Sequence, residues 1–375
     1  MFLKTFGASL AIAAIGLALG FIYGGPTGLA VTAILAILEV SLSFDNAVVN
    51  ATVLVRMSPF WQKIFLTVGV AIAVFGMRLL FPLLIVGITA KLTPNEAIRL
   101  ALEKGSAHEK GTYGYLLHQA HPAIAAFGGV FLMLIFLDFI LEEREITWLT
   151  WLERPLARIG KLDQLSVVIT LIALALAAYE LAPSNKVSTV LLSGLLGMAT
   201  YLVVNGLGEF FETEEDEVVE NALEHSDTAP ASGNGTRAVV QAVGKAAFFL
   251  FLYLEVLDAS FSFDGVVGAF AITSDPIIIA IGLGIGAMFI RSLTVYLVRK
   301  GTLAEYVYLE HGALWAIGAL AVLLLVTIKY EVPEVVTGLI GVGFIGAALA
   351  SSIARNRRAA TTDGAGGLER EPAGV

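Results

Sequence analysis

The sequence comprises 375 residues, with a formal net charge of -9 and no cysteine. Hydrophobic residues make up 57% of the chain and charged residues only 15%, and the mean hydropathy is +0.83. Because soluble domains carry about 25% charged residues, this composition excludes a soluble globular protein. The absence of cysteine excludes disulfides, zinc–thiolate sites and cysteine nucleophiles. We therefore expect an all-α polytopic membrane protein.

Ten apolar runs are long enough to cross a membrane as helices, each of which needs about 20 residues. The runs are continuously apolar, whereas the strands of a membrane β-barrel alternate. The first five are expected at residues 6–23, 28–55, 64–89, 123–141 and 165–181. The second five are expected at residues 187–207, 239–272, 277–298, 313–328 and 335–353.

Polar segments divide the chain into two membrane halves, a linker and a tail. An acidic stretch, residues 208–237, joins the first half, residues 1–207, to the second, residues 238–354, and residues 355–375 form a polar tail. The long loop after the third run is expected to hold a short surface helix opened by Thr93 and Pro94.

The distribution of positive charge predicts the orientation. Lys and Arg in alternate loops number fourteen on one side and six on the other. Because loops rich in Lys and Arg remain in the cytoplasm, we expect a protein of the plasma (inner) membrane with both termini in the cytoplasm.

A short motif of acids and serines occurs twice within the apolar runs. The first copy spans residues 39–45 (Glu-Val-Ser-Leu-Ser-Phe-Asp), and the second, 219 positions later, spans residues 258–264 (Asp-Ala-Ser-Phe-Ser-Phe-Asp). A charged side chain at the bilayer centre costs about 2.5–3.5 kcal/mol on insertion scales, which favours a functional site. Structural helix–helix hydrogen bonds are the alternative. The copies lie five runs apart and so point in opposite directions, which predicts an inverted repeat of two halves with a site near the midplane.

Each copy of the motif is followed, on the next run, by an arginine. These residues are Arg78 and Arg291. We interpret them as charge compensation for the motif acids or as side chains that snorkel to the membrane surface, and a role in gating is the alternative. The second arginine follows Gly282, Gly284 and Gly286, a pattern that predicts close helix packing.

The side chains of the motifs offer the oxygen ligands that hard divalent cations prefer. Those expected to bind a metal are Glu39, Asp45, Asn46, Asp258 and Asp264. Those expected to support them are Ser41, Ser43, Asn50, Glu255, Ser260 and Ser262. Asp138, near the end of the fourth run, is a further candidate ligand, although an acid close to water at a helix end needs no ion.

The first motif fits two backbone conformations. On an unbroken helix, one polar stripe is formed by Glu39, Ser43, Asn46 and Asn50. In an unwound segment, alternation instead gathers the acids and serines of residues 39–45 on one side and frees backbone carbonyls to bind a cation. The spacing of the residues does not choose between the two.

The motif regions resemble the signatures of the TerC family. Residues 41–47 (Ser-Leu-Ser-Phe-Asp-Asn-Ala) look like the first signature, and residues 262–265 (Ser-Phe-Asp-Gly), running into residues 270–276, look like the second. TerC-like proteins are integral membrane proteins associated with tellurium resistance, share a superfamily with the LysE exporters and include manganese exporters. The resemblance implies an ion site formed by Glu39, Asp45, Asn46 and Asp264.

The leading hypothesis is a secondary transporter, rather than an enzyme, that exports a divalent cation. Mn²⁺ is favoured as the substrate, and Ca²⁺ and Mg²⁺ are alternatives. Protons that bind the same acids would couple metal export to proton entry. The expected partners are the lipid bilayer and these ions; no nucleic acid is expected, and the oligomeric state is not specified.

Two other hypotheses come from different classes of protein. One is a membrane scaffold in a tellurium or metal stress response, with the acids holding a structural ion. The other is an intramembrane aspartyl protease, which also needs two membrane aspartates. That class usually carries Gly-x-Gly-Asp and Tyr-Asp, whereas this chain has Phe-Asp-Asn and Phe-Asp-Gly.

Overall fold

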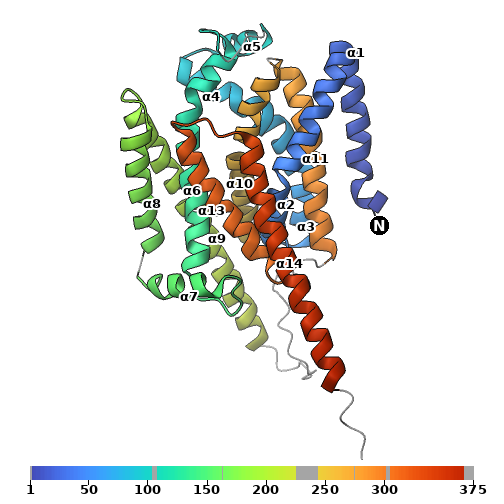
Figure 1. Ribbon diagram of the computed structural model, residues 1–375, viewed down its shortest axis with the longest axis vertical. Coiled ribbons are helices and arrows are strands. Elements are labelled where there is room, and N and C mark those ends of the chain that lie inside the picture. The colour runs from blue at the N-terminus through green and yellow to red at the C-terminus, as the bar shows by residue number, and fades with distance from the viewer. Residues whose placement is uncertain are drawn as a thin grey trace, which may run out of the picture.

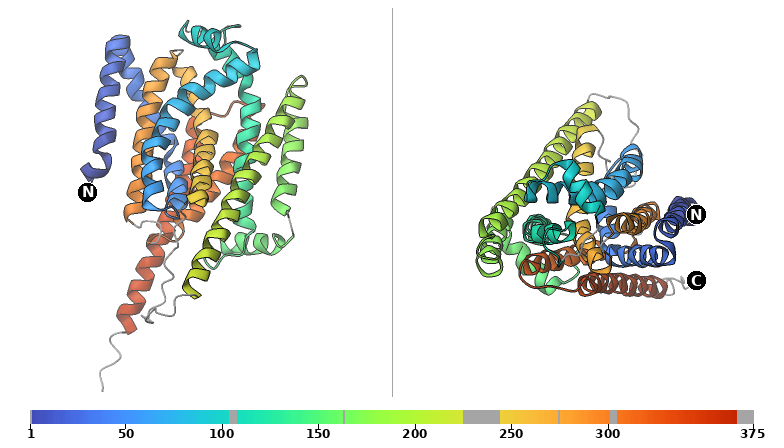
Figure 2. Two further views of the ribbon diagram at one scale, coloured as in Figure 1. Left: turned by 180° about the vertical axis from the view of Figure 1, so that it is seen from behind. Right: turned by 90° about the horizontal axis from the view of Figure 1, so that it is seen from above.

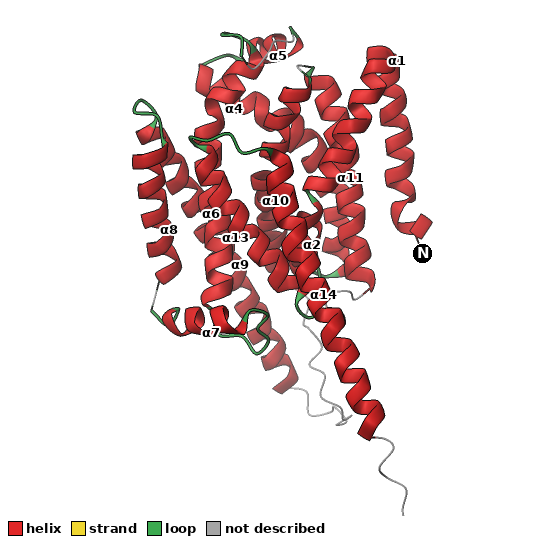
Figure 3. Ribbon diagram, viewed as in Figure 1, coloured by secondary structure: helices red, strands yellow, loops and turns green. Residues whose placement is uncertain are grey.

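Every regular element in the described part of the chain is a helix (Figure 3). The computed structural model describes residues 2–103, 108–162, 164–224, 244–273, 275–300 and 305–366. Within these ranges seven helices are long and apolar enough to cross a membrane. They are Thr5–Val40, Pro59–Ile88, Tyr113–Leu141, Val187–Leu207, Pro276–Lys300, Leu309–Thr327 and Val336–Arg358. The prediction of an all-α membrane protein is confirmed.

Helix α1 (Phe2–Leu42) turns back on itself, so that its two legs lie side by side (Figure 1). The turn is at Gly25, whose φ of 64° lies in the region that favours glycine. The legs approach closely, since a Cβ on Gly28 would stand 2.4 Å from the carbonyl oxygen of Gly20. The first expected run and the first part of the second thus form one helical hairpin, and the rest of the second run lies in the next helix.

The chain then continues through a series of short helices, two of which are π-helices. A π-helix is rare and is often found at functional sites, because its wider turn shifts the register of the side chains. In chain order the elements are α2 (Phe44–Leu54), α3 (Pro59–Ile64), η1 (Phe65–Gly69), η2 (Ile72–Leu80) and α4 (Phe81–Ala90).

Two short helices lie at opposite ends of the molecule: α5 (Pro94–Leu102) at one end and α7 (Thr150–Ile159) at the other (Figure 1). The surface helix predicted after Thr93 is confirmed as α5. Its start is stabilised by a capping box, in which the Glu96 carboxylate accepts a hydrogen bond of 2.8 Å from the backbone N–H of Thr93.

The centre of the bundle is occupied by α6 (Tyr113–Leu141), which packs against α9 (Val187–Glu224) and α13 (Leu309–Thr327). Its middle contributes fully buried side chains such as Phe131 and Leu134 to the main hydrophobic core. Helix α8 (Leu165–Leu176), extended by η3 (Ala177–Leu181), lies at the periphery (Figure 1).

The second half of the chain contributes α10 (Gly244–Ile272), α11 (Pro276–Lys300) and α14 (Glu334–Gly366). Helix α11 packs closely on α1 (Figure 2). A Cβ on Gly282 of α11 would stand 2.6 Å from the Cβ of Leu35 on α1. The close helix packing that the glycines predicted is therefore found at this contact.

Several boundaries differ from those that hydropathy predicts. Helix α9 continues through the first part of the acidic stretch, because Glu is a strong helix former, and α14 continues beyond residue 353. Residues 225–237, the rest of the expected linker, residues 238–243 at the start of the expected second half, and residues 367–375 of the tail lie outside the described part. The total of ten spans and the inverted repeat remain predictions.

Candidate functional site

The first acid of the first motif is held by an arginine in the protein interior. Glu39, in the last turns of α1, forms an ion pair with Nη2 of Arg78 on η2. Both residues are buried. The same Glu39 oxygen, Oε1, accepts a hydrogen bond of 3.3 Å from the Ser43 hydroxyl, and Arg78 Nη1 donates to the carbonyl of Ala73 at 2.7 Å. The π-helical turn of η2 thus helps to fix the guanidinium beside the acid.

The second motif has a corresponding arrangement around Arg291 of α11. Its guanidinium lies 3.1 Å from Oε1 of Glu255 and 3.3 Å from Oδ2 of Asp258, the first acid of the second motif. It also donates to the carbonyl of Phe65 at 3.2 Å and lies over the ring of that residue, 4.0 Å from the centroid. In both motifs the first acid is therefore paired with the arginine of a following helix.

The two arrangements meet in one place, which we call the charged cluster: Glu39, Arg78, Glu255, Asp258 and Arg291. A Cβ on Gly265, directly after the second motif, would stand 3.1 Å from Oε2 of Glu39 in the first. Asp258 also interacts electrostatically with Arg78. The residue that directly follows the second motif thus contacts the first acid of the first motif, which lies 226 positions earlier in the sequence.

Glycines make room for the charged cluster on two sides. A Cβ on Gly286 of α11 would stand 2.4 Å from Cβ and Cγ of Glu39. A Cβ on Gly69 of η1 would stand 2.5 Å from Nη1 of Arg291 and 2.6 Å from Oε1 of Glu255. Any larger side chain at these positions would displace a charged partner, so the cluster depends on both glycines.

The charged cluster is buried, and its charges are only partly balanced. Its five residues are 2–5% exposed. Moving an unpaired charge from water into such an interior costs several kcal/mol, which close partners must offset. Each guanidinium nevertheless retains a buried Nε without a hydrogen-bond partner among the described residues, and the cluster carries three carboxylates against two guanidiniums.

The backbone of the first motif is helical with one bend. Ser43, between α1 and α2, has φ -100° and ψ 18°, and its N–H still bonds to the carbonyl of Glu39 at 2.9 Å. The second motif lies within the continuous helix α10. Ser43 is thus the one residue of the first motif outside a helix, and the alternative of a motif unwound over residues 39–45 is not what the structure shows. The helical stripe is buried along its length: Glu39, Ser43, Asn46 and Asn50.

The remaining predicted ligands are only partly described. The side chains of Ser41, Asp45, Ser262 and Asp264 lie outside the described part of the structure. Ser260 is buried and donates to the carbonyl of Val256 at 3.0 Å. Among the described side chains there is no group of three His, Asp or Glu residues arranged to hold a metal ion. The carboxylates of the charged cluster are paired with arginines.

Two other predicted residues have contrasting environments. Asn50 is 1% exposed, and neither its amide nitrogen nor its amide oxygen has a hydrogen-bond partner in the described part of the chain. A buried amide without hydrogen-bond partners lowers the stability of the folded protein, so we expect a polar ligand or water to bind Asn50. Asp138, by contrast, is exposed and accepts a hydrogen bond from the hydroxyl of Tyr201.

A cavity of about 290 Å³ borders the charged cluster on the side of α5. Arg78 forms part of its wall, together with Val266 of α10 and Tyr113 of α6. Ile98 and Leu102 of α5 line it as well, and both are exposed at the surface. The cavity thus connects the level of Arg78 with the end of the molecule where α5 lies.

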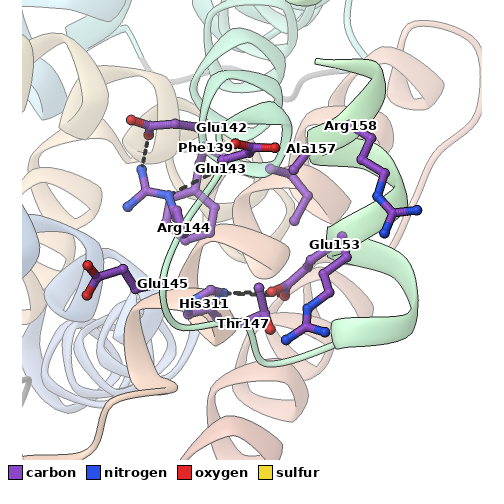
Figure 4. A pocket seen from close by; sticks show the side chains of 12 residues that line it. Phe139, Glu142, Glu143, Arg144, Glu145, Thr147, Glu153, Ala157, Arg158 and His311 are labelled. Carbon is purple, nitrogen blue, oxygen red and sulfur yellow. Dashed lines mark hydrogen bonds and ion pairs between the residues drawn. The ribbon is translucent and has the colours of Figure 1, made fainter. Parts of the chain in front are cut away.

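A second polar cluster, at the other end of the bundle, was missed from the sequence. The Glu153 carboxylate on α7 accepts hydrogen bonds from the Trp315 indole at 3.1 Å and from the N–H groups of Trp148 and Leu149 at 2.9 and 3.2 Å. Nδ1 of His311 on α13 lies 3.2 Å from the same carboxylate (Figure 4). Single Glu and His residues far apart in sequence give no motif, so only the fold brings them together.

These features define a class: a polytopic helical membrane protein with ionisable side chains buried where two copies of a motif meet. A family model described as "Protein of unknown function (DUF475)" matches residues 44–359. The match covers most of the chain, and the protein belongs to the DUF475 family. It includes Asp45, Arg78 and the whole second motif, whereas Glu39 precedes it. Neither the curated proteins nor the solved structures gave a match.

Proposed function

We propose that the protein is a secondary transporter that exports a divalent metal cation, with Mn²⁺ favoured, across the plasma membrane. The observation that carries the proposal is that the two motifs meet: Gly265, directly after the second motif, lies against Glu39 of the first, beside a charged cluster whose residues are 2–5% exposed. Intramembrane acids are costly and commonly mark ion pathways. Two oppositely directed helices that meet at such acids are typical of transporters with a central site.

The charge balance supports a cation as the substrate. The two motifs and Glu255 contribute five acids, whereas Arg78 and Arg291 contribute two positive charges. In this proposal the two arginines stay ion-paired with Glu39, Glu255 and Asp258. The cation binds the carboxylates of Asp45 and Asp264, and the amide of Asn46 is a further ligand. A divalent ion and a proton together would neutralise the excess of three negative charges. Exchange of the ion for protons would then couple export to proton entry.

A cavity on one side of the site and buried amides on the other also support transport. The cavity beside Arg78 extends towards α5, on the side where the loops carry few Lys and Arg. Towards the opposite end, Asn46 and Asn50 are one turn apart on α2 and both are buried. The unsatisfied amide of Asn50 fits a polar route from the cytoplasm to the motif.

The decisive experiment is a flux measurement with purified protein in proteoliposomes loaded with a Mn²⁺-sensitive dye. We expect Mn²⁺ movement by the wild type, and its loss in Asp45→Asn and in Asp264→Asn with normal membrane insertion. Glu142→Gln, which removes an exposed acid paired with Arg144, is the matched control and should retain flux. Wild-type flux in either motif variant would refute the proposal.

The same preparations separate the other two classes. A scaffold with a structural ion would move no metal in any variant, including the wild type. An aspartyl protease would cleave a hydrophobic peptide in detergent, and would lose that cleavage in Asp45→Asn. Competition among Mn²⁺, Ca²⁺ and Mg²⁺ for flux would establish the preferred ion.

A further inference from the structure

Helix α7 lies across one end of the bundle, unlike the helices that run along it (Figure 1). Its buried face carries Glu153 and Ala157. Its outward side is unusually apolar: Trp151 is 75% exposed and Ile159 is 53% exposed, with Pro155 between them at helical spacing. Large exposed apolar side chains, including a tryptophan, are typical of helices at the boundary between lipid and water.

A stripe of positive charge runs beside this apolar stripe. Arg154 and Arg158 are exposed and one turn apart on α7. Neither forms an ion pair within the described residues. An amphipathic helix with adjacent apolar and basic stripes lies in the plane of a membrane surface, where its basic side chains meet anionic headgroups.

The two arginines also line a cavity of about 410 Å³ between α7, the end of α6 and α13 (Figure 4). Two of the four acids that line it are paired with basic side chains: Glu142 with Arg144 at 2.6 Å and Glu143 with Lys161 at 3.0 Å. Glu153 is held by hydrogen bonds from Trp315 and the backbone and lies 3.2 Å from His311. Arg154 and Arg158 form no ion pair in the described part of the chain, so both guanidiniums can bind an anion.

The position of α7 is fixed by a buried anchor. Glu153 is 4% exposed and is bonded to Trp315 and His311 of α13 as well as to the backbone before α7. Because this anchor holds α7 to a membrane-crossing helix, Arg154 and Arg158 are presented at a constant height relative to the bundle. Such preorganisation lowers the entropic cost of binding a ligand.

We propose that α7 and this cavity bind the phosphate headgroup of an anionic phospholipid from the leaflet at this end of the bundle. Arg154 and Arg158 contact the phosphate, and the acyl chains lie along Trp151 and Ile159. The basic stripe supplies the preference for anionic lipid, and the apolar stripe supplies contact with any lipid. The inference does not depend on which solute the protein transports.

Quenching of the fluorescence of Trp151 by brominated lipid is the measurement that tests the proposal. Full-length protein is reconstituted in vesicles of phosphatidylcholine with either brominated phosphatidylglycerol or brominated phosphatidylcholine, and tryptophan quenching is measured. We expect stronger quenching by the brominated anionic lipid, and loss of this difference in Trp151→Phe. In Arg154→Ala/Arg158→Ala the preference for the anionic lipid should fall about thirtyfold, since each of the two basic side chains near an anionic surface contributes about 1 kcal/mol.

Two control variants test whether the lipid preference depends on where the charge lies and on its sign. Arg99→Ala/Lys110→Ala removes two exposed positive charges at the opposite end and should leave the preference intact, whereas Glu145→Gln should increase it. Equal quenching by both lipids in the wild type, or a preference that survives in Arg154→Ala/Arg158→Ala, would overturn the proposal. Displacement of the brominated anionic lipid by inorganic phosphate would assign the site to a soluble anion and overturn it as well.

Discussion

Gly265 of α10 lies against the carboxylate of Glu39 on α1. A Cβ at position 265 would stand only 3.1 Å from Oε2 of Glu39. This contact joins the end of the second motif to the beginning of the first. In the first motif the position equivalent to Gly265 is Asn46, so the two copies are not interchangeable at their point of contact. The smaller residue on α10 is what allows the acid of α1 to approach.

The ion pair between Glu39 and Arg78 should be strongly coupled. We expect Glu39→Gln or Arg78→Met alone to lower the free energy of unfolding in detergent by about 3–5 kcal/mol, because each leaves a buried charge without its partner. The double variant should be destabilised by much less than the sum of the two single variants. Denaturant titration of all four proteins measures this coupling, and additive effects would contradict the pairing.

Gly286 should not tolerate even a methyl group. A Cβ there would stand 2.4 Å from Cβ and Cγ of Glu39, so Gly286→Ala should destabilise the protein by about 1–3 kcal/mol through overpacking. Gly346→Ala is the matched control, since no described atom lies within 4 Å of its Cβ position. That variant should be neutral or stabilising by up to about 1 kcal/mol through helix propensity. Thermal denaturation of the two variants in the same detergent tests the difference.

Asn50 should be reached by water from the end of the bundle where α7 lies. The chain has no cysteine, so Asn50→Cys introduces a single thiol. We expect it to react with a small, membrane-impermeant methanethiosulfonate from that side only, and faster than Val48→Cys, which is equally buried on the same helix. Mass spectrometry of sided vesicles gives the two rates. Equal protection of both thiols would argue against a polar route along α2.

The interactions of Glu153 that hold α7 to α13 should weaken at acidic pH. Burial of the Glu153 carboxylate raises its pKa, but the hydrogen bonds from His311, Trp315 and the backbone outweigh burial, and the pKa is lowered from 4.5. A carboxyl group with a lowered pKa in the folded state contributes stability above its ordinary pKa and loses it as the pH falls through the folded value. The stabilisation should therefore be complete at neutral pH and decline below about pH 4.5.

Glu153→Gln separates this effect from general acid denaturation. At neutral pH the variant should lose about 1–3 kcal/mol, because an amide is a weaker acceptor than a carboxylate for these donors. The difference in unfolding free energy between variant and wild type should then shrink as the pH falls below 4.5. A difference that stays constant over this range, measured by denaturant titration at each pH, would show that Glu153 is not the titrating group.

The sequence by itself determined that the protein is an all-α membrane protein, because apolar runs of this length leave few other structures for the backbone. It also singled out Glu39, Asp258, Arg78 and Arg291, which the structure brings together, since charged residues are conspicuous in an apolar context. It did not determine the bend at Ser43, which lies inside an apolar run, or the length of α9, because helix propensity continues where hydropathy changes.

Only the tertiary structure decided which charges are partners. Glu255 and Asp258 share Arg291, Glu39 is held by Arg78, and Glu153 meets His311 across 158 positions of sequence. Such pairings depend on where helices cross and on glycines such as Gly286, which carry no charge and give no signal of their own. The physical reason is that a hydropathy pattern specifies which face of a helix is buried, whereas the packing of neighbouring helices specifies what that face meets.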